Sequence, residues 1–133
     1  MAKYFTIGEL CKSDTALAKN IENTPDNTTI GKLNVLMVEC LDKVRALWGK
    51  PIGVNSGYRS PELNRAVGGA KNSQHLRGEA ADITTGSKEN NRELFDLIVA
   101  SDIPFDQLID ESGYRWLHIS YCTDYNRKQV LHL

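Results

Sequence analysis

The chain carries its clearest signal in Ser73-Gln74-His75-Leu76-Arg77-Gly78-Glu79-Ala80-Ala81-Asp82-Ile83, where a histidine and an aspartate stand on either side of a glycine. The seven-residue spacing of His75 and Asp82 would also suit one face of a helix. Gly78 and the β-branched, glycine-closed run Ile83-Thr84-Thr85-Gly86 instead predict a loop followed by a strand. Because side chains alternate along a strand, Asp82 could then reach a metal held by His75.

A third candidate ligand, His118, lies in the apolar, strand-like run Trp116-Leu117-His118-Ile119-Ser120-Tyr121. Together with His75 and Asp82 it suggests a zinc site of two imidazoles and one carboxylate. Three protein ligands leave the fourth position of a catalytic zinc open for water, whereas structural zinc sites are usually closed by four ligands. The set therefore indicates a site for chemistry. The remaining histidine, His132, lies in the terminal run Val130-Leu131-His132-Leu133.

Each of these three residues also has an ordinary structural explanation. An isolated histidine in a polar loop, such as His75, is more often solvated than bound to a metal, and Asp82 alone would be a turn or capping residue. A histidine between Leu117 and Ile119 is more often a hydrogen-bonded core imidazole than a ligand. Taken one by one, the residues leave the metal site open.

Length and composition predict one globular domain that spans residues 1–133. Of these residues 41% are hydrophobic and 25% charged, which is enough to bury a core. The formal net charge of −1 gives no general attraction to nucleic acid, so no nucleic-acid partner is expected. No apolar run approaches the roughly 20 residues that cross a bilayer, so we expect no membrane insertion. We also expect a monomer.

The N-terminal residues and the cysteines indicate in which cellular compartment the protein is made. Met1-Ala2-Lys3-Tyr4-Phe5-Thr6 lacks the apolar stretch and cleavage site of a secretory signal, so we expect synthesis in the cytoplasm without a signal peptide. Cys11, Cys40 and Cys122 form no CxxC pair, which argues against a disulfide framework and against a thiolate zinc site. We expect them to be small buried hydrophobes in reducing surroundings.

Apolar spacing and capping residues predict the helices. The longest runs from about Thr29 to Trp48, where apolar residues recur at the three-and-four spacing of an amphipathic helix. Two short helical turns are expected at residues 6–10 and 13–18. A short helix should start at Pro61 with Ser60 as its cap, and another should run from Ser87 to about Ala100.

Strands are predicted at residues 52–56, at residues 107–111 and around His118. Ser112-Gly113-Tyr114 would connect the last two, which makes them candidates for an antiparallel pair. Strands and helices do not alternate as repeated βαβ units. We therefore predict an α+β fold in which a small antiparallel sheet carries the zinc site and packs against helices.

A longer pattern connects these residues to a known family. Ser-x-His-x-x-Gly-x-Ala-x-Asp stands at residues 73–82 and is followed by Trp-x-His at residues 116–118. The chain thereby resembles the zinc D-alanyl-D-alanine carboxypeptidases of the VanY and hedgehog-like fold group, in their compact, phage-associated branch. The resemblance covers nearly the whole chain, more loosely before Thr29. It extends to Ser56-Gly57-Tyr58-Arg59-Ser60, Leu63-Asn64-Arg65-Ala66-Val67-Gly68-Gly69 and Phe105-Asp106-Gln107-Leu108-Ile109.

The resemblance implies that His75, Asp82 and His118 hold one zinc ion. The family also uses a carboxylate as general base, most often a glutamate three residues before the last histidine. That position is Arg115 here. Glu111, seven residues before His118, ends the preceding strand, as the corresponding glutamate does in some relatives, so we assign it as the base. Asp110, which should face the other way on the strand, is the second candidate.

Two further residues take roles from the same resemblance. Arg59 would hold the carboxylate of the substrate or polarise its scissile carbonyl, since a guanidinium can donate two hydrogen bonds to one anion. Without the motif, we would expect Arg59 to form an ion pair on the surface. Ser73 matches a substrate-contacting serine, although it could also merely cap the local turn. Trp116 and Tyr114 are candidates for lining a sugar or peptide groove, but aromatics in such strands more often pack in the core.

The resemblance implies a zinc-dependent metallopeptidase that hydrolyses peptide bonds in the stem peptide of bacterial peptidoglycan, of the D-alanyl-D-alanine carboxypeptidase type. One alternative is an L-alanyl-D-glutamate endopeptidase, that is, an endolysin. Another is a non-catalytic, zinc-bearing module that binds the cell wall. The expected site of action is the cell wall, in cell-wall degradation during phage lysis.

Overall fold

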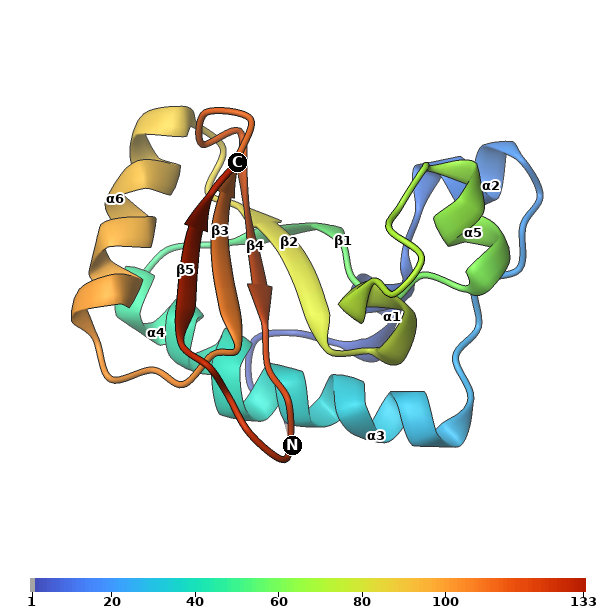
Figure 1. Ribbon diagram of the computed structural model, residues 1–133, viewed down its shortest axis with the longest axis horizontal. Helices are drawn as coiled ribbons and strands as arrows, with labels where there is room; N and C mark the ends of the chain where they lie inside the picture. The colour runs from blue at the N-terminus through green and yellow to red at the C-terminus, as the bar shows by residue number, and fades with distance from the viewer. Residues whose placement is uncertain (1) are drawn as a thin grey trace.

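A five-stranded sheet forms the centre of the computed structural model, which describes residues 2–133 (Figure 1). The strand order is β1-β2-β4-β3-β5. Neighbouring strands are antiparallel except for β3 and β5, which run parallel. The strands are β1 (Gly53–Ser56), β2 (Ala80–Thr84), β3 (Gln107–Glu111), β4 (Trp116–Ser120) and β5 (Gln129–His132).

The prediction of an α+β fold with a small sheet against helices is confirmed, and so is the antiparallel pair β3–β4. The expectation that the sheet would be antiparallel throughout is wrong, because β5 adds a parallel edge strand. This strand has only four residues, and most of them are exposed, so no alternation of apolar and polar residues marks it.

In residues 2–133, six α-helices, one π-helical segment and one 3₁₀ turn surround the sheet. They are α1 (Ile7–Cys11), α2 (Asp14–Ala18), α3 (Asn27–Leu36), the π segment η1 (Met37–Leu41), α4 (Asp42–Trp48), α5 (Pro61–Ala66), the 3₁₀ turn η2 (Gln74–Arg77) and α6 (Lys88–Ala100). The predicted cap Ser60 is confirmed, and Thr6, Ser13 and Ser87 cap their helices in the same way: each hydroxyl accepts a hydrogen bond from a backbone N–H three residues ahead.

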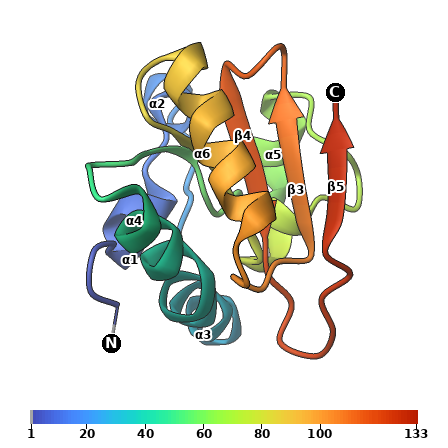
Figure 2. The same ribbon diagram turned by 90° about the vertical axis from the view of Figure 1, so that its left-hand side faces the viewer.

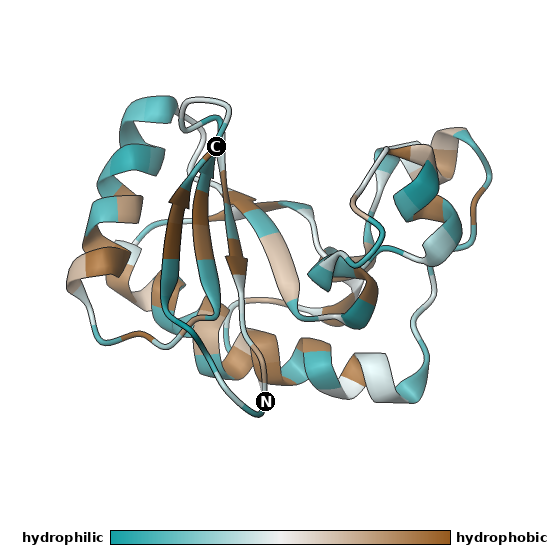
Figure 3. Cartoon of the chain, in the orientation of Figure 1, coloured by the Kyte–Doolittle hydropathy of each residue, from teal (hydrophilic) through white to brown (hydrophobic). Residues whose placement is uncertain are grey.

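The predicted long helix is present as α3, η1 and α4 in succession, with a wider π turn in its middle. Together with α6 it covers one face of the sheet (Figure 2). Buried apolar residues of this helix, of α6 and of the strands form one core. Much of the strands and of the long helix is accordingly brown, that is hydrophobic, in Figure 3. Leu47 lies outside this core with 38% of its surface exposed, although its spacing predicted burial.

Side chains that alternate along the strands divide the sheet into two faces. Ile83, Leu117 and Ile119 are fully buried and join the apolar core beneath the helices. Asp82 and His118 alternate with them and therefore point to the opposite face. The helices thus bury one face of the sheet, and the other face is left for the candidate site.

The three cysteines differ in how deeply they are buried. Cys40 is completely buried in the core, and burial raises the pKa of its thiol to about 12. Cys11 and Cys122 are only partly buried, so the expectation of burial is wrong for these two.

No helix of residues 2–133 is both long and apolar enough to cross a membrane.

Candidate metal centre

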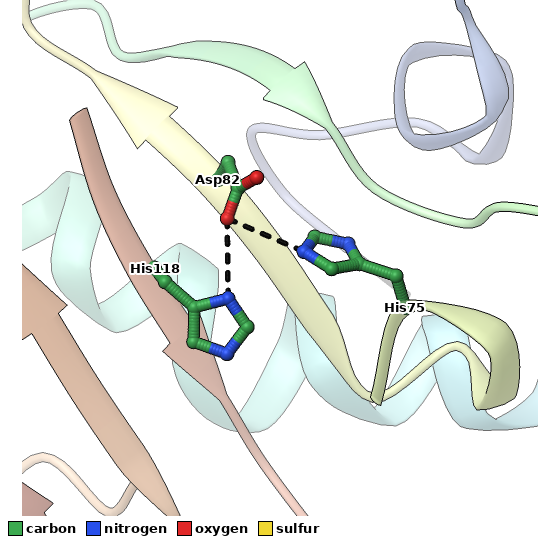
Figure 4. Close-up of side chains that lie close together, drawn as sticks. All are labelled: His75, Asp82 and His118. Carbon is green, nitrogen blue, oxygen red and sulfur yellow. Dashed lines mark hydrogen bonds and ion pairs between the residues drawn. The ribbon is translucent and has the colours of Figure 1, made fainter. Parts of the chain in front are cut away.

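Three side chains from three separate elements meet on the open face of the sheet: His75 from η2, Asp82 from β2 and His118 from β4 (Figure 4). The Oδ1 atom of Asp82 lies 3.3 Å from Nε2 of His75 and 3.1 Å from Nδ1 of His118. One possible ligand atom from each residue lies within 4.8 Å of the other two. The sequence prediction that these three residues come together is confirmed in its geometry.

Strand register explains why Asp82 and His118 are neighbours. The two residues stand directly opposite each other in the antiparallel pair of β2 and β4, so their side chains leave the sheet on the same face. Small residues allow this close pairing, because Ala80 and Ala81 precede Asp82 on β2 and are fully buried. The placement of two ligands therefore follows from the pairing of two strands.

A tight turn brings the third ligand to the same place. His75 lies in η2, which begins at Ser73 and ends at Gly78 with φ of 73°, a conformation that favours glycine. A Cβ atom at Gly78 would lie 2.9 Å from the backbone oxygen of Thr29 on α3, so the turn packs closely on the long helix. The Oγ atom of Ser73 accepts a hydrogen bond from the backbone N–H of His75 at 3.2 Å. Ser73 therefore caps the turn that carries the ligand, in addition to lining the cavity described below.

The imidazole of His75 is held in one orientation. Its side chain is 3% exposed, and its Nδ1 lies 2.6 Å from the carbonyl oxygen of Gly57. A carbonyl oxygen only accepts hydrogen bonds, so Nδ1 must carry a hydrogen, and Nε2 is the ring nitrogen that faces Asp82. A hydrogen bond from the ring nitrogen that faces away from the metal is the usual way in which proteins fix the tautomer of a metal-binding histidine.

Asp82 is held in its ionised form. Burial on its own would raise the pKa of this carboxyl, but hydrogen bonds from His118 and His75, together with their charges, outweigh burial and hold the pKa well below its usual range. A carboxylate binds a cation far better than a carboxylic acid does. Asp82 is therefore ready to act as a ligand at any physiological pH.

The donor set fits a single zinc ion. Zinc accepts imidazole nitrogen and carboxylate oxygen at about 2.0–2.2 Å, so two ligand atoms at a tetrahedral angle lie roughly 3.3–3.5 Å apart. The distances of 3.3 and 3.1 Å from Asp82 to the two histidines are close to this separation. Two imidazoles and one carboxylate leave a fourth position free for water or substrate, which suits catalysis better than scaffolding.

A cavity of about 500 Å³ opens over the three residues. Its lining includes the other predicted site residues, Arg59, Ser73 and Glu111, as well as Gln74 and Trp116. Arg115 does not line the cavity, although it occupies the position where the resemblance would place a glutamate.

The two candidate bases on β3 point to different sides. Glu111 lines the cavity, and its charge acts on Arg59. Asp110 is buried and its carboxylate makes a close hydrogen bond with Nδ1 of His132 on β5. The expectation that these neighbours face opposite ways on the strand is thus confirmed, and only Glu111 is near the three ligands.

Hydrogen bonds to two neighbouring side chains hold the guanidinium of Arg59 in place. Its Nε donates to the Ser56 hydroxyl at 3.1 Å and its Nη1 donates to Oδ1 of Asn64 at 2.8 Å, while Nη2 lies 3.8 Å from Asp82. Burial lowers the pKa of the guanidinium, and the carboxylates of Asp82 and Glu111 oppose that shift. Its side chain is 14% exposed, so the alternative of a surface ion pair is wrong.

Two residues that support the site received no role from the sequence. Asn64 is buried and binds both Arg59 and the carbonyl oxygen of Ala70. Asp106 is buried and accepts a hydrogen bond from Nε2 of Gln74, next to the ligand His75. Asn64 and Asp106 do lie in two of the segments that carry the family resemblance, and this was the available signal.

Comparison with known proteins agrees with this geometry. The sequence model of the peptidase M15 family matches residues 3–120, which is most of the chain. The chain belongs to the peptidase M15 family. All of the ligands and cavity residues of this M15 chain named above lie within the matched range. The resemblance inferred from the residues alone is thereby confirmed.

One relative of this M15 chain is a zinc D-Ala-D-Ala carboxypeptidase of Streptomyces albus G. The two sequences are 40% identical over 86 residues, which cover 63% of this chain and 32% of that protein. The chain thus spans about a third of the length of this curated relative.

Proposed function

We propose that this protein is a zinc-dependent metallopeptidase that hydrolyses peptide bonds in the stem peptide of bacterial peptidoglycan, of the D-alanyl-D-alanine carboxypeptidase type. The observation that carries the proposal is the meeting of His75, Asp82 and His118 in one cavity that also contains a free carboxylate, Glu111. Membership of the M15 family supports the same assignment, and so does the similarity to the zinc D-Ala-D-Ala carboxypeptidase of Streptomyces albus G.

His75, Asp82 and His118 would hold the zinc ion. When bound, zinc acts as a Lewis acid that lowers the pKa of water toward about 7 and polarises a carbonyl group. Glu111 acts as general base and takes a proton from the water that adds to the scissile carbonyl carbon. As the C–N bond breaks, Glu111 returns that proton to the leaving amine. One water is consumed, and a carboxylate and an amine are released.

Arg59 supplies positive charge in the same cavity. In this proposal it donates hydrogen bonds to the oxygen that becomes negative when water adds to the carbonyl, or to the terminal carboxylate of the substrate. Its contacts with Ser56 and Asn64 hold the guanidinium in place before substrate arrives. A donor held in advance needs no reorganisation during the reaction, which is the usual source of electrostatic stabilisation.

A second candidate function, L-alanyl-D-glutamate endopeptidase, is favoured by the shape of the surface around Arg59. A second cavity of about 460 Å³ lies beyond this side chain and is lined by polar residues that include Ser13 and Asn55. Arg59 and Gly69 line both cavities, so the two cavities adjoin at these residues. An endopeptidase needs room for substrate on both sides of the cleaved bond, whereas a carboxypeptidase needs room mainly on one.

Digestion of purified peptidoglycan would test the proposal and separate the candidates. The protein is incubated with peptidoglycan in zinc and, in parallel, in chelator, and mass spectrometry identifies the released fragments. Zinc-dependent release of free D-alanine supports the carboxypeptidase. New amino termini at D-glutamate support the endopeptidase instead. Binding without any product supports the third alternative, a non-catalytic module that binds the cell wall.

A peptidoglycan substrate would also place the site of action at the cell wall. We propose a role in cell-wall degradation of the kind that accompanies phage lysis, by a protein that acts as a monomer. Sedimentation of the protein with intact cell walls, with and without zinc, tests the location independently of the chemistry.

A further inference from the structure

Two buried polar atoms beside the metal centre have no hydrogen-bond partner anywhere in residues 2–133. They are Nε1 of Trp116 and Oε1 of Gln74. Both residues line the cavity that contains the three ligands. Folded proteins pair nearly all of their buried polar atoms, so each exception calls for an explanation, and a catalytic role is one of them.

The orientation of the Gln74 amide follows from its neighbours. Its Nε2 donates to Oδ2 of Asp106 at 2.9 Å, and Asp106 is in turn held by the guanidinium of Arg127 at 2.7 and 2.9 Å. A carboxylate only accepts hydrogen bonds, so the NH₂ group of Gln74 must face Asp106. Rotating the amide would break this bond and would place Oε1 against the carboxylate of Asp106, where two acceptors repel. The free acceptor is therefore fixed by the surrounding residues.

The position of Trp116 follows from strand register. It stands two residues before His118 on β4, so both side chains lie on the open face of the sheet. Trp116 is also directly opposite Glu111 of β3. Its indole nitrogen can only donate a hydrogen bond. The residue that carries this unused donor thus lines the cavity beside the proposed general base.

The two unpaired atoms lie on opposite sides of His118 along β4. Trp116 begins this strand, whereas Gln74 contacts Cys122 and Asp106 beyond its other end, where the backbone N–H of Asp106 binds the carbonyl oxygen of Ser120. From Trp116 to Ser120 the strand extends by roughly 13 Å at about 3.3 Å for each residue. An extended peptide of about four residues covers the same length.

We propose that the indole N–H of Trp116 and the amide oxygen of Gln74 bind the main chain of the peptide substrate on either side of the metal centre. Trp116 donates to a substrate carbonyl oxygen, and Gln74 accepts a substrate N–H. A peptide main chain offers both groups at regular intervals, which matches one donor and one acceptor at the two ends of the groove. The two contacts would fix which peptide bond lies over the zinc. This inference rests on the proposed function.

Equilibrium binding of a stem peptide would test the contact of Trp116. Isothermal titration calorimetry measures the affinity of a synthetic stem pentapeptide that ends in D-alanyl-D-alanine, with zinc-loaded protein in a Glu111→Gln background. Trp116→Phe keeps an aromatic ring and removes the donor together with one ring of the indole. We expect affinity to fall roughly 3- to 10-fold, the effect of one hydrogen bond. The matched control is Trp48→Phe in the core helix, which should leave affinity unchanged.

Stability distinguishes this role from a structural one. Trp116→Phe removes an unpaired buried N–H, so it should lower the melting temperature less than Trp48→Phe, which shrinks a core side chain. Gln74→Met should weaken peptide binding by a similar factor. In the double variant Trp116→Phe/Gln74→Met the two factors should multiply.

The outcomes separate this inference from the proposed function. If the Glu111→Gln protein binds the pentapeptide and neither Trp116→Phe nor Gln74→Met changes its affinity, the inference is overturned and the proposed function stands. If the variants weaken binding of glycan chains without peptide instead, the inference is also overturned, because the groove then recognises sugar. If the protein neither binds nor cleaves stem peptides or peptidoglycan, the proposed function is overturned, and the inference that rests on it is overturned as well.

Discussion

His75 donates its Nδ1 hydrogen to the backbone carbonyl oxygen of Gly57, 18 positions earlier in the chain. This bond leaves Nε2 as the only ring nitrogen that can bind a cation beside Asp82. It also connects a ligand of the metal centre to the loop that follows β1. The orientation of one ligand thus depends on the backbone of a residue that carries no side chain.

Gly57→Ala should disturb this connection. An added Cβ atom would lie 2.3 Å from the backbone oxygen of Leu10, where no flexible side chain can give way. We expect a loss of about 1–3 kcal/mol in the free energy of unfolding, and a roughly 10- to 100-fold loss in zinc affinity. Denaturant titration and competition with a fluorescent zinc chelator measure the two effects.

Gly31→Ala is the matched control for that substitution. Gly31 lies in the exposed interior of α3 and has open space at its Cβ position. Alanine should stabilise the helix by about 0.5–1 kcal/mol and leave zinc affinity unchanged. Equal zinc affinity in Gly57→Ala and Gly31→Ala would contradict the importance of the Gly57 carbonyl.

Glu111 and Asp110 should respond differently to loss of charge. Glu111→Gln should retain zinc and stability within about 0.5 kcal/mol, while kcat falls about 10²- to 10⁴-fold, because the proposed base is lost. Asp110→Asn should retain most of kcat and lose about 1–3 kcal/mol of stability, because the buried contact with His132 is broken. Steady-state kinetics and thermal unfolding measure both variants. The reverse pattern would make Asp110 the base.

Arg59→Lys should separate charge from geometry. Lysine keeps the positive charge but cannot reproduce the planar fork that Ser56 and Asn64 hold. We expect kcat/KM to fall about 10²-fold with unchanged zinc content. Ser56→Ala is a milder test, since it removes only the contact with Nε. Full activity in Arg59→Lys would show that a point charge is sufficient at this position.

The lowered pKa of Asp106 predicts that the protein loses stability in acid. Hydrogen bonds from Arg127, which outweigh the effect of burial, hold the pKa of its carboxyl below the usual range. A carboxyl with a lowered folded-state pKa stabilises the protein above its unfolded pKa of about 3.9, and this stabilisation is lost as the pH falls below about 4. Asp106→Asn should therefore show a shallower decline in stability between pH 5 and pH 2.

Urea unfolding at several pH values, in chelator so that metal release does not contribute, measures that decline. Asp124, an exposed carboxyl of the neighbouring loop, provides the control. Asp124→Asn should follow the wild-type curve at every pH. If Asp106→Asn did so as well, the contact between Asp106 and Arg127 would contribute nothing to stability.

Local rules predicted much of the fold. The capped helices, the antiparallel pair of β3 and β4 and the long amphipathic helix all follow from residues close together in the sequence. Two features depend on distant contacts and had no such signal. The edge strand β5 is short and exposed, and it gains its structure from pairing with β3. The π turn inside the long helix changes its register without a break in the apolar pattern.

The site was predictable to the extent that its residues form a motif. His75, Asp82 and His118 were found by their spacing and by the family pattern, and the structure brings them together. The unpaired oxygen of Gln74 was not predictable, because it depends on a chain of polar contacts through Asp106 to Arg127. Polar side chains far apart in the sequence carry no periodicity, so only a structure shows that they meet.

The central claim is that one zinc ion at these three ligands supports hydrolysis of the peptidoglycan stem peptide. Titration of zinc into metal-free protein, with fragment release from peptidoglycan measured at each step, tests it directly. We predict no release without zinc, a linear rise with added zinc, and saturation at one equivalent. Release that persists in chelator, or that saturates at a different ratio, would contradict the account.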